Sequence, residues 1–222
     1  MIQLDNFKSW RNISKETKEK FLKNSTYMEY TKGTVIYLES EQNPLIYLIS
    51  SGYIVLSKTS IEGKEKYLYY LSTGDFINQC AIDGKLTATT AKVVSDASLI
   101  SIDKDILLRL MKEDFELNLL ILTSLTHIIR RSQRQILNLG IYNTSQRIAS
   151  RLWKLSRDYG KKIDDYTLID APINQTDLSN MVGASRETVN RFLKELENKG
   201  IVILKGHSII IIDRDRLLDY IN

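Results

Sequence analysis

Arg186, Glu187 and Arg191 stand close together in the stretch INQTDLSNMVGASRETVNRFLKELENKG, which runs from Ile173 to Gly200. An arginine can make two parallel hydrogen bonds to O6 and N7 of guanine, and a glutamate can accept one from N4 of cytosine. Phosphate would repel an isolated acid, so a glutamate between two arginines favours base reading over phosphate binding. We therefore predict that these three side chains contact base edges of double-stranded DNA.

The same stretch predicts two short helices joined by a tight turn. The first helix is expected over about 175–181, with the turn at Gly183, because glycine adopts the left-handed backbone such a turn requires. Ser185 is expected to cap the second helix. At 100° per residue, one side of that helix is apolar and the other charged. The apolar side comprises Val189, Phe192, Leu193 and Leu196. The pattern is that of a helix-turn-helix; the alternative is a solvated helix with incidental ion pairs.

Short polar side chains lie near the starts of both predicted helices, where phosphate oxygens bind well. The predicted phosphate contacts are Gln175, Thr176, Ser185 and Thr188. A hairpin is expected next, turning around Lys205-Gly206-His207, with its second strand over 208–212.

The region before this motif predicts a long helix, because residues 114–139 contain no glycine or proline. Apolar residues recur there at alternating spacings of three and four, which is a heptad seam. The seam comprises Leu122, Leu125, Ile129, Ser132, Ile136 and Leu139. We interpret it as a homodimer contact; the alternative is packing on its own domain. A hinge is expected at 140–143, then an amphipathic helix over 145–158 and a polar loop.

Residues 30–102 are punctuated by glycines and rich in β-forming runs. The runs lie at 35–37, 45–49, 53–56, 67–71, 91–94 and 99–102. Short strands with turn signals at intervals of about ten residues predict an antiparallel sandwich or barrel. The segment before residue 30 predicts a polar helix.

The composition narrows the class of protein. Hydrophobic residues make up 43% of the 222 residues and charged residues 26%, so the chain can bury a core. The net charge of +4 is compatible with nucleic acid. The single cysteine, Cys80, excludes an internal disulfide and fits a reducing compartment. The N-terminus has no apolar signal core, and no apolar run approaches the ~20 residues of a membrane span. We expect a cytoplasmic protein without membrane contact.

With its regions in this order, the chain resembles the CRP/FNR family of bacterial transcription regulators over nearly its whole length. The string VGASRETVNRFLKELENKG is similar to the family's recognition helix. The resemblance implies an α+β fold: an antiparallel, jelly-roll-type β-roll of the cyclic-nucleotide-binding kind over 1–110, a dimerisation helix over 111–140 and a winged helix-turn-helix over 141–222. It places Arg186, Glu187 and Arg191 on the base-reading positions. It implies a palindromic operator with TGTGA-like half-sites, and RNA polymerase contacts by the loops at 61–63 and 159–165.

The chain departs from the family where cAMP-responsive members hold the cyclic phosphate. The turn at 74–77 is kept, but Asn78-Gln79 replaces Gly-Glu, and Thr87-Ala88 replaces Arg-Ser. Without the arginine, the phosphodiester lacks a charge-assisted partner, so cAMP is not expected. A small organic effector stays open. The predicted effector-pocket residues are Tyr69, Leu71, Thr87, Thr89, Ser132 and Gln133. The alternative is that the strand residues among them are ordinary core.

Other chemistries find little support in the residues. One cysteine is too few for a cysteine-ligated iron–sulfur cluster. A haem sensor using Cys80 or His127 stays open; the alternative for Cys80 is a buried small hydrophobe. The other histidine, His207, lies in a different region, so no metal site is expected.

No catalytic constellation or phosphate-cradling glycine loop is present, which excludes an enzyme. The predicted function is a homodimeric DNA-binding regulator, switched by an effector other than cAMP. The alternatives are a constitutive regulator whose β-roll binds no ligand, and a haem or redox sensor.

Overall fold

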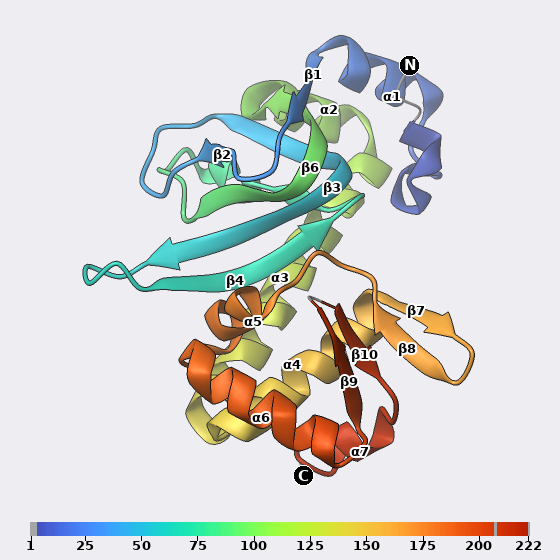
Figure 1. Ribbon diagram of the computed structural model, residues 1–222. Coiled ribbons are helices and arrows are strands. Elements are labelled where there is room, and N and C mark those ends of the chain that lie inside the picture. The colour runs from blue at the N-terminus through green and yellow to red at the C-terminus, as the bar shows by residue number, and fades with distance from the viewer. Residues whose placement is uncertain (1–3, 207, 222) are drawn as a thin grey trace. The chain divides into compact units, whose positions relative to one another are not determined.

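The computed structural model of the protein describes residues 4–206 and 208–221. The chain forms two compact units, Met1–Ser60 with Leu68–Arg131 and Ile61–Tyr67 with Ser132–Asn222. His207, expected at the tip of the C-terminal hairpin, lies outside the described residues. The helices and antiparallel sheets of both units confirm the predicted α+β class (Figure 1).

The first unit is built on an antiparallel sheet in the order β1-β6-β3-β4, with β2 paired to β6 and β5 to β3. The strands are β1 (Ser25–Tyr30), β2 (Val35–Tyr37), β3 (Leu45–Thr59), β4 (Glu65–Ser72), β5 (Phe76–Ile77) and β6 (Thr90–Asp103). The 3-10 helices are η1 (Leu4–Asn6), η2 (Lys8–Trp10) and η3 (Gln79–Asp83). The α-helices are α1 (Lys15–Lys23), α2 (Lys104–Glu113) and α3 (Phe115–Ile141). Helix α3 continues into the second unit.

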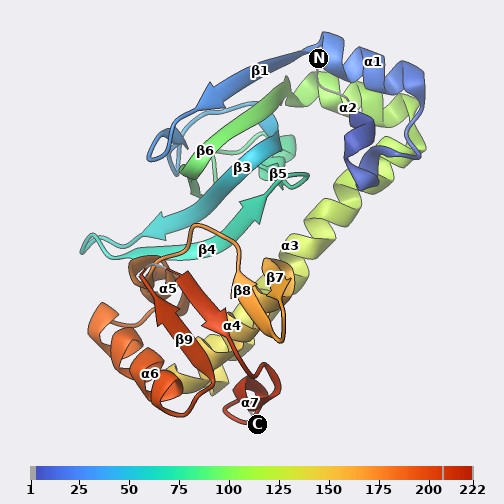
Figure 2. The same cartoon turned by 45° about the vertical axis from the view of Figure 1, so that its right-hand side comes forward.

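Two long strands replace four short ones that the sequence predicts. The runs at 45–49 and 53–56 belong to the single strand β3, and those at 91–94 and 99–102 to β6, which lies beside it (Figure 2). The register shifts around Ser51 and Tyr53 mark a bulge. Gly52 has φ +84°, and a Cβ there would lie 2.4 Å from the Asp96 carbonyl oxygen. This glycine therefore permits a bulge inside a strand instead of ending the strand.

The N-terminal segment is only partly helical, so the prediction of a polar helix up to residue 30 is wrong for its last residues. After α1, residues 25–30 form β1, which pairs with β6 along its whole length. Helix α1 buries Phe21 against Trp10, with ring centroids 4.7 Å apart. The strand was missed because four of its six residues are exposed, which removes the alternating pattern.

Asp114 joins the end of α2 to the start of α3 and to the N-terminus of α1. Its carboxylate accepts the backbone N–H of Ser14 at 3.1 Å and that of Glu116 at 3.0 Å. Burial raises the pKa of this carboxyl, but hydrogen bonds from Thr17 and Ser14 outweigh burial, and the pKa lies below its ordinary value. The ionised form therefore stabilises the fold.

Replacing Asp114 by alanine should lower the free energy of unfolding by about 1 kcal/mol at pH 7, as for loss of a helix cap. Because the folded-state pKa is lowered, this stabilisation is present above the ordinary aspartate pKa of about 3.9 and is lost as the pH falls through the folded value. Urea unfolding of wild type and Asp114→Ala from pH 7 to pH 3 should show the difference shrinking below about pH 4. The exposed Asp105→Ala is the control; equal midpoints for Asp114→Ala and wild type at pH 7 would contradict the assignment.

The second unit combines short helices with a sheet in the order β7-β8-β10-β9. Its elements after α3 are α4 (Thr144–Asp158), β7 (Gly160–Ile163), β8 (Tyr166–Ile169), α5 (Gln175–Val182), α6 (Arg186–Asn198), β9 (Val202–Lys205), β10 (Ser208–Ile211) and α7 (Asp215–Leu218). The polar loop predicted after residue 158 is instead the β7–β8 hairpin, with Gly160 paired to Ile169 and Ile163 to Tyr166. All four residues of β7 are exposed, so no apolar alternation signals the strand.

Candidate nucleic-acid interface

The turn between α5 and α6 has the backbone that glycine permits. Gly183 caps α5 with φ 70° and ψ 49°, and its N–H donates to the carbonyl of Ser179 at 2.9 Å. This is the left-handed C-cap expected from the sequence. At the other end of α5, Asn174 and Asp177 form a capping box. Local sequence signals therefore fix both ends of the first helix.

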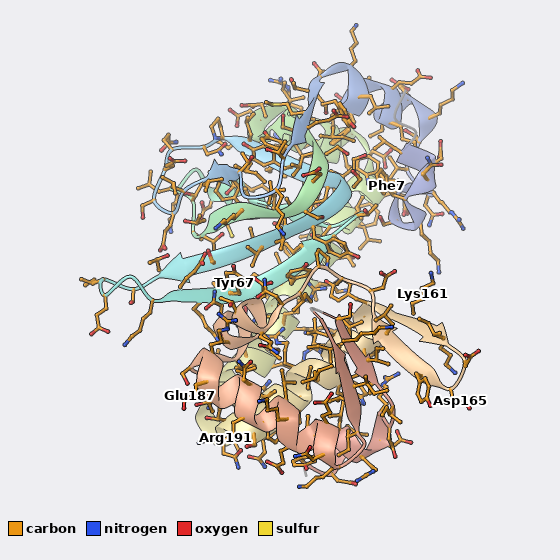
Figure 3. All side chains as sticks on the ribbon, in the orientation of Figure 1. Phe7, Tyr67, Lys161, Asp165, Glu187 and Arg191 are labelled. Carbon is orange, nitrogen blue, oxygen red and sulfur yellow. The ribbon has the colours of Figure 1, made fainter. Side chains whose placement is uncertain are left out.

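Helix α6 is amphipathic, as predicted. The Ser185 hydroxyl accepts the backbone N–H of Thr188 at 3.1 Å and so begins the helix. The buried side, where no residue is more than 4% exposed, consists of Val189, Phe192, Leu193 and Leu196. Arg186, Glu187 and Arg191 are exposed. Figure 3 shows Glu187 and Arg191 on the outward side of the helix.

The three predicted base-reading residues thus lie in the first half of a helix of 13 residues. Such a helix is about 20 Å long and, with side chains, about 10–12 Å across. The major groove of B-DNA is about 12 Å wide and admits a helix of this size. The arrangement can present two guanidinium groups and one carboxylate to base edges.

A hollow of about 280 Å³ lies between the starts of α5 and α6 and the β9–β10 hairpin. Gln175 and Thr176, both predicted phosphate contacts, line it together with Arg186. Leu204 and Ser208 of the hairpin close its other side. The tertiary structure therefore places the hairpin beside residues that the sequence assigns to DNA. The sequence predicted the hairpin but did not indicate which of its residues would lie there.

The other two predicted phosphate contacts serve the helix itself. The hydroxyls of Ser185 and Thr188 are 2.9 Å apart and hydrogen-bond to each other. Asn190, on the same helix, has a buried side-chain oxygen without a partner among the described residues. The 100° spacing places Asn190 on the charged side of the helix, so the sequence did not indicate its partial burial.

Two family models match the chain in the same order as these units. The cyclic nucleotide-binding domain matches residues 27–114, and the Crp-like helix-turn-helix domain matches residues 146–220. The cAMP-activated global transcriptional regulator CRP of Salmonella typhimurium is 30% identical over 212 residues, which cover 88% of this chain and 93% of that protein. The chain belongs to the CRP/FNR family. It is a DNA-binding transcription regulator of that type, as the sequence predicts.

A further curated relative and two solved structures are also similar to this chain. The anaerobic regulatory protein of Bacillus subtilis is 28% identical, covering 87% of this chain and 82% of that protein. The structure of FixK2 from Bradyrhizobium japonicum has a TM-score of 0.78 at 22% identity, covering 88% of this chain and 96% of that one. A CooA mutant from Carboxydothermus hydrogenoformans has a TM-score of 0.79 at 20% identity, covering 90% and 89%. These structures share the fold, and the curated relatives are regulators, not enzymes.

The predicted seam residues of this CRP/FNR chain lie on α3. The exposed ones are Leu122 at 51%, Ile129 at 56%, Ile136 at 71% and Leu139 at 54%. Leu125 is partly buried against the core of the first unit. Most of the stripe is therefore exposed, and its apolar residues form one patch on α3 instead of being scattered singly over the surface.

The six predicted effector-pocket residues have different surroundings. Leu71 is 2% exposed and lines a cavity in the first unit, whose lining includes none of the other five. Tyr69 packs against the β-roll core. Buried Thr87 donates its hydroxyl hydrogen bond to the carbonyl of Leu38, and Thr89 hydrogen-bonds with Tyr37. Ser132 and Gln133 follow in α3.

Two further features bear on the cofactor hypotheses. Cys80, expected to be buried if it were a small hydrophobe, is exposed at η3. Among residues 4–206 and 208–221, no three histidine, cysteine or acidic side chains are grouped to hold a metal ion.

None of the helices described is long and apolar enough to cross a membrane.

Proposed function

We propose that the protein is a homodimeric regulator that reads a palindromic operator with TGTGA-like half-sites and responds to an effector other than cAMP. The observation that supports this operator sequence is the set of side chains on the exposed side of α6. Arg186, Glu187 and Arg191 are exposed there beside a buried apolar face, and these residue types suit guanine and cytosine edges. Two copies of α6 about one helical turn apart would match a twofold operator.

The exposed apolar stripe on α3 supports the homodimer. A second copy of the same helix would cover Ile129 and Ile136 by heptad packing. The switch is a population shift, in which an effector near α3 changes the seam and the connection between α3 and α4 reorients the recognition helices. Of the hinge predicted at 140–143, Gly140 and Ile141 lie in the last turn of α3, and Tyr142 and Asn143 form the connection.

The polar side chains at the positions of the family's phosphate cradle support an effector other than cAMP, because they bind the chain itself. The Asn78 amide donates to the carbonyls of Asn43 and Leu45, at 3.1 and 2.8 Å. The Gln79 amide donates to the Ser124 hydroxyl at 2.7 Å. None of these groups supplies the cation that a cyclic phosphate requires. Some relatives are named as cAMP-activated. In our proposal, this chain differs from those relatives because cAMP does not activate it.

A second candidate is a constitutive regulator whose β-roll binds no ligand. Its support is the packing inside the β-roll, where Tyr37 and Tyr47 are both buried and stack with centroids 5.9 Å apart. A haem sensor is the third, with exposed Cys80 or His127 as ligand. A Soret band in the purified protein would favour it, and a colourless preparation would remove it. Contacts with RNA polymerase would use the turn at 61–63, where Ile61 is fully exposed, and the β7–β8 hairpin.

The direct test is fluorescence anisotropy with a palindromic TGTGA duplex and a scrambled duplex over a salt series. We expect the palindrome to bind about a thousandfold more tightly at physiological salt. Both affinities should fall as salt rises, since phosphate contacts release counterions. Adding cAMP should change the dissociation constant less than about twofold, because none of the residues at the positions of the family's phosphate cradle (Asn78, Gln79, Thr87 and Ala88) carries a positive charge.

Tenfold tighter binding with cAMP would overturn the effector assignment. Equal binding to both duplexes at every salt concentration would contradict the operator in the state tested. Selection from random duplexes, repeated with candidate ligands present, would then separate a wrong half-site from an effector-dependent dimer.

A further inference from the structure

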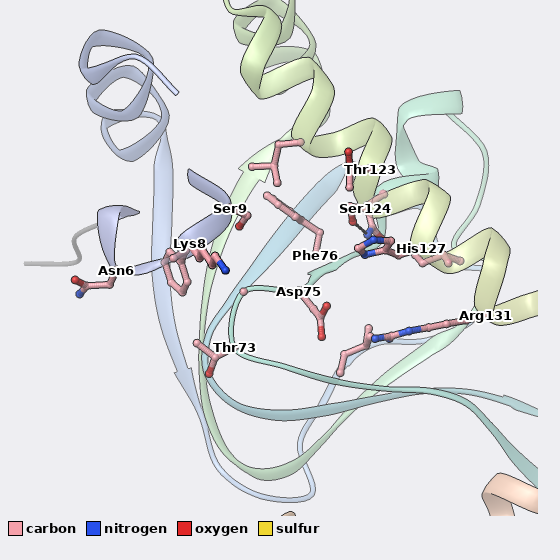
Figure 4. Close-up of a pocket in the computed structure, with 16 residues that line it drawn as sticks. Asn6, Lys8, Ser9, Thr73, Asp75, Phe76, Thr123, Ser124, His127 and Arg131 are labelled. Carbon is pink, nitrogen blue, oxygen red and sulfur yellow. Dashed lines mark hydrogen bonds between the residues drawn. The ribbon is translucent and has the colours of Figure 1, made fainter. Parts of the chain in front are cut away.

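A cavity of about 520 Å³ lies in the first unit, and its lining includes neither Tyr37 nor Tyr47 of the β-roll core. Three segments far apart in the sequence form its wall: residues 6–9, residues 71–79 and the side of α3 from Leu120 to Arg131. Figure 4 shows Lys8 and Ser9 entering from the N-terminal segment, and His127 and Arg131 from α3 across the cavity. Its volume is in the range of small-molecule sites, about 300–1,000 Å³.

Much of the wall is apolar and firmly packed. Phe7, Leu71 and Phe76 are each at most 8% exposed and are held in the hydrophobic clusters of the unit. Leu120 and Ile128 add apolar surface from α3. A flat hydrocarbon group of one or two rings would find a preformed surface here, so binding would need little reorganisation of the protein.

The polar part of the wall is mainly cationic. Lys8 and Arg131 carry positive charge. No hydrogen bond or ion pair joins either side chain, or that of His127, to another described residue. Asp75 is the one acidic side chain in the lining, and its carboxylate accepts the backbone N–H of Ser72 at 3.0 Å. The net charge of the lining is therefore positive, and it favours an anion.

The residues of α3 that line the cavity lie on a different face from the predicted seam. Leu120, Ser124 and Arg131 recur at helical spacing on the cavity side. Leu122, Ile129 and Ile136 recur on a roughly opposite side. A molecule in the cavity would touch the helix without displacing a seam residue, and so could act on the seam through the helix itself.

We propose that this cavity binds an organic anion, with an apolar body of one or two rings against Phe7 and Phe76 and a carboxylate or phosphate facing Lys8 and Arg131. The inference deepens the proposed function, because it gives the effector its chemical class and its place, and it rests on that function only for the role of the ligand. The acidic group supplies Lys8 and Arg131 with a negatively charged hydrogen-bond acceptor, and the ring body covers the apolar wall.

The test is isothermal titration calorimetry with three probes that share one ring system: 1-naphthylacetate, 1-naphthyl phosphate and the neutral 1-naphthylacetamide. We expect at least one acid to bind about tenfold more tightly than the amide, because only an acid gains charge-assisted hydrogen bonds. The carboxylate and the phosphate then show which acidic group the site prefers.

Arg131→Gln and Lys8→Gln should each weaken binding of the preferred acid about tenfold and leave the amide unaffected. Arg109→Gln, an exposed arginine of α2 outside the cavity, loses the same charge and should bind as wild type. Circular dichroism melting of each variant shows whether the fold is kept. A second pair, Arg131→Lys and Lys8→Arg, keeps the charge and should retain most of the affinity.

Equal binding of acids and amide, no binding of either acid, or full affinity in both Arg131→Gln and Lys8→Gln would overturn the inference. DNA binding by the same preparations is measured without any probe. Selective operator binding combined with no acid binding would reject the cavity site and leave the regulator intact. Acid binding without operator binding would reject the operator and leave the site.

Discussion

Arg191→Ala should abolish selective binding to the palindromic duplex while leaving weak, salt-dependent binding to any DNA. Arg191 is exposed on α6, one turn beyond Glu187, next to the buried Phe192. A bidentate arginine–guanine contact is worth about 1–3 kcal/mol, and a dimer would lose two such contacts. At about 2 kcal/mol each, the loss corresponds to roughly a thousandfold in the dissociation constant.

The matched control for this experiment is Arg216→Ala, an exposed arginine of α7 in the same unit. It removes the same charge and should weaken binding to both duplexes slightly and equally. Anisotropy titrations of both variants on the palindromic and scrambled duplexes separate loss of base reading from loss of charge. If Arg191→Ala weakened the two duplexes by the same factor, Arg191 would be a phosphate contact.

The same titrations with a Glu187→Ala variant should give a result that differs from that of Arg191→Ala. Removing this carboxylate should leave or raise the affinity for the scrambled duplex, because an acid near phosphates is repulsive. Selectivity at one base pair should nevertheless fall, since the acceptor for cytosine N4 is lost. No purely electrostatic role predicts that combination. A Glu187→Ala variant with unchanged discrimination at every position would show that Glu187 does not read a base.

The second large effect is expected at the seam, where Ile129→Glu should convert a dimer into monomers. Ile129 is 56% exposed on a single chain, and a partner helix would bury it against its own copy. Two carboxylates facing each other in an apolar seam cost several kcal/mol, because each is desolvated beside a like charge. Sedimentation equilibrium should show the mass falling from that of two chains to that of one.

Leu137→Glu is the control for the seam, since Leu137 is 46% exposed on α3 but lies off the heptad stripe. It should remain a dimer. The monomeric variant should also lose operator affinity, because a palindrome rewards two linked recognition helices. A dimeric Ile129→Glu, or a monomeric wild type at micromolar concentration, would place the dimer contact elsewhere or remove it.

Much of the DNA-binding half could be predicted from the sequence because its signals are local. Gly183 and Ser185 set the turn and the helix start through their own backbone and side-chain chemistry. The buried face of α6 follows from a 3.6-residue period that one short stretch contains. The exposed stripe on α3 is likewise a repeat along a single helix.

Tertiary structure decided what depends on partners far away in the sequence. Gly52 looks like a turn in the chain, and only the approach of Asp96 shows it to be a bulge in one long strand. The sequence does not show which group Thr87 meets, and only the fold places its hydroxyl beside the carbonyl of Leu38. The cavity is lined by residues 6–9, 71–79 and 120–131, which are far apart in the sequence. No local sequence pattern indicates that these segments lie together. Local periodicity and caps therefore determined α6 with its exposed charged side and the exposed stripe on α3, whereas long-range packing determined the cavity in the first unit.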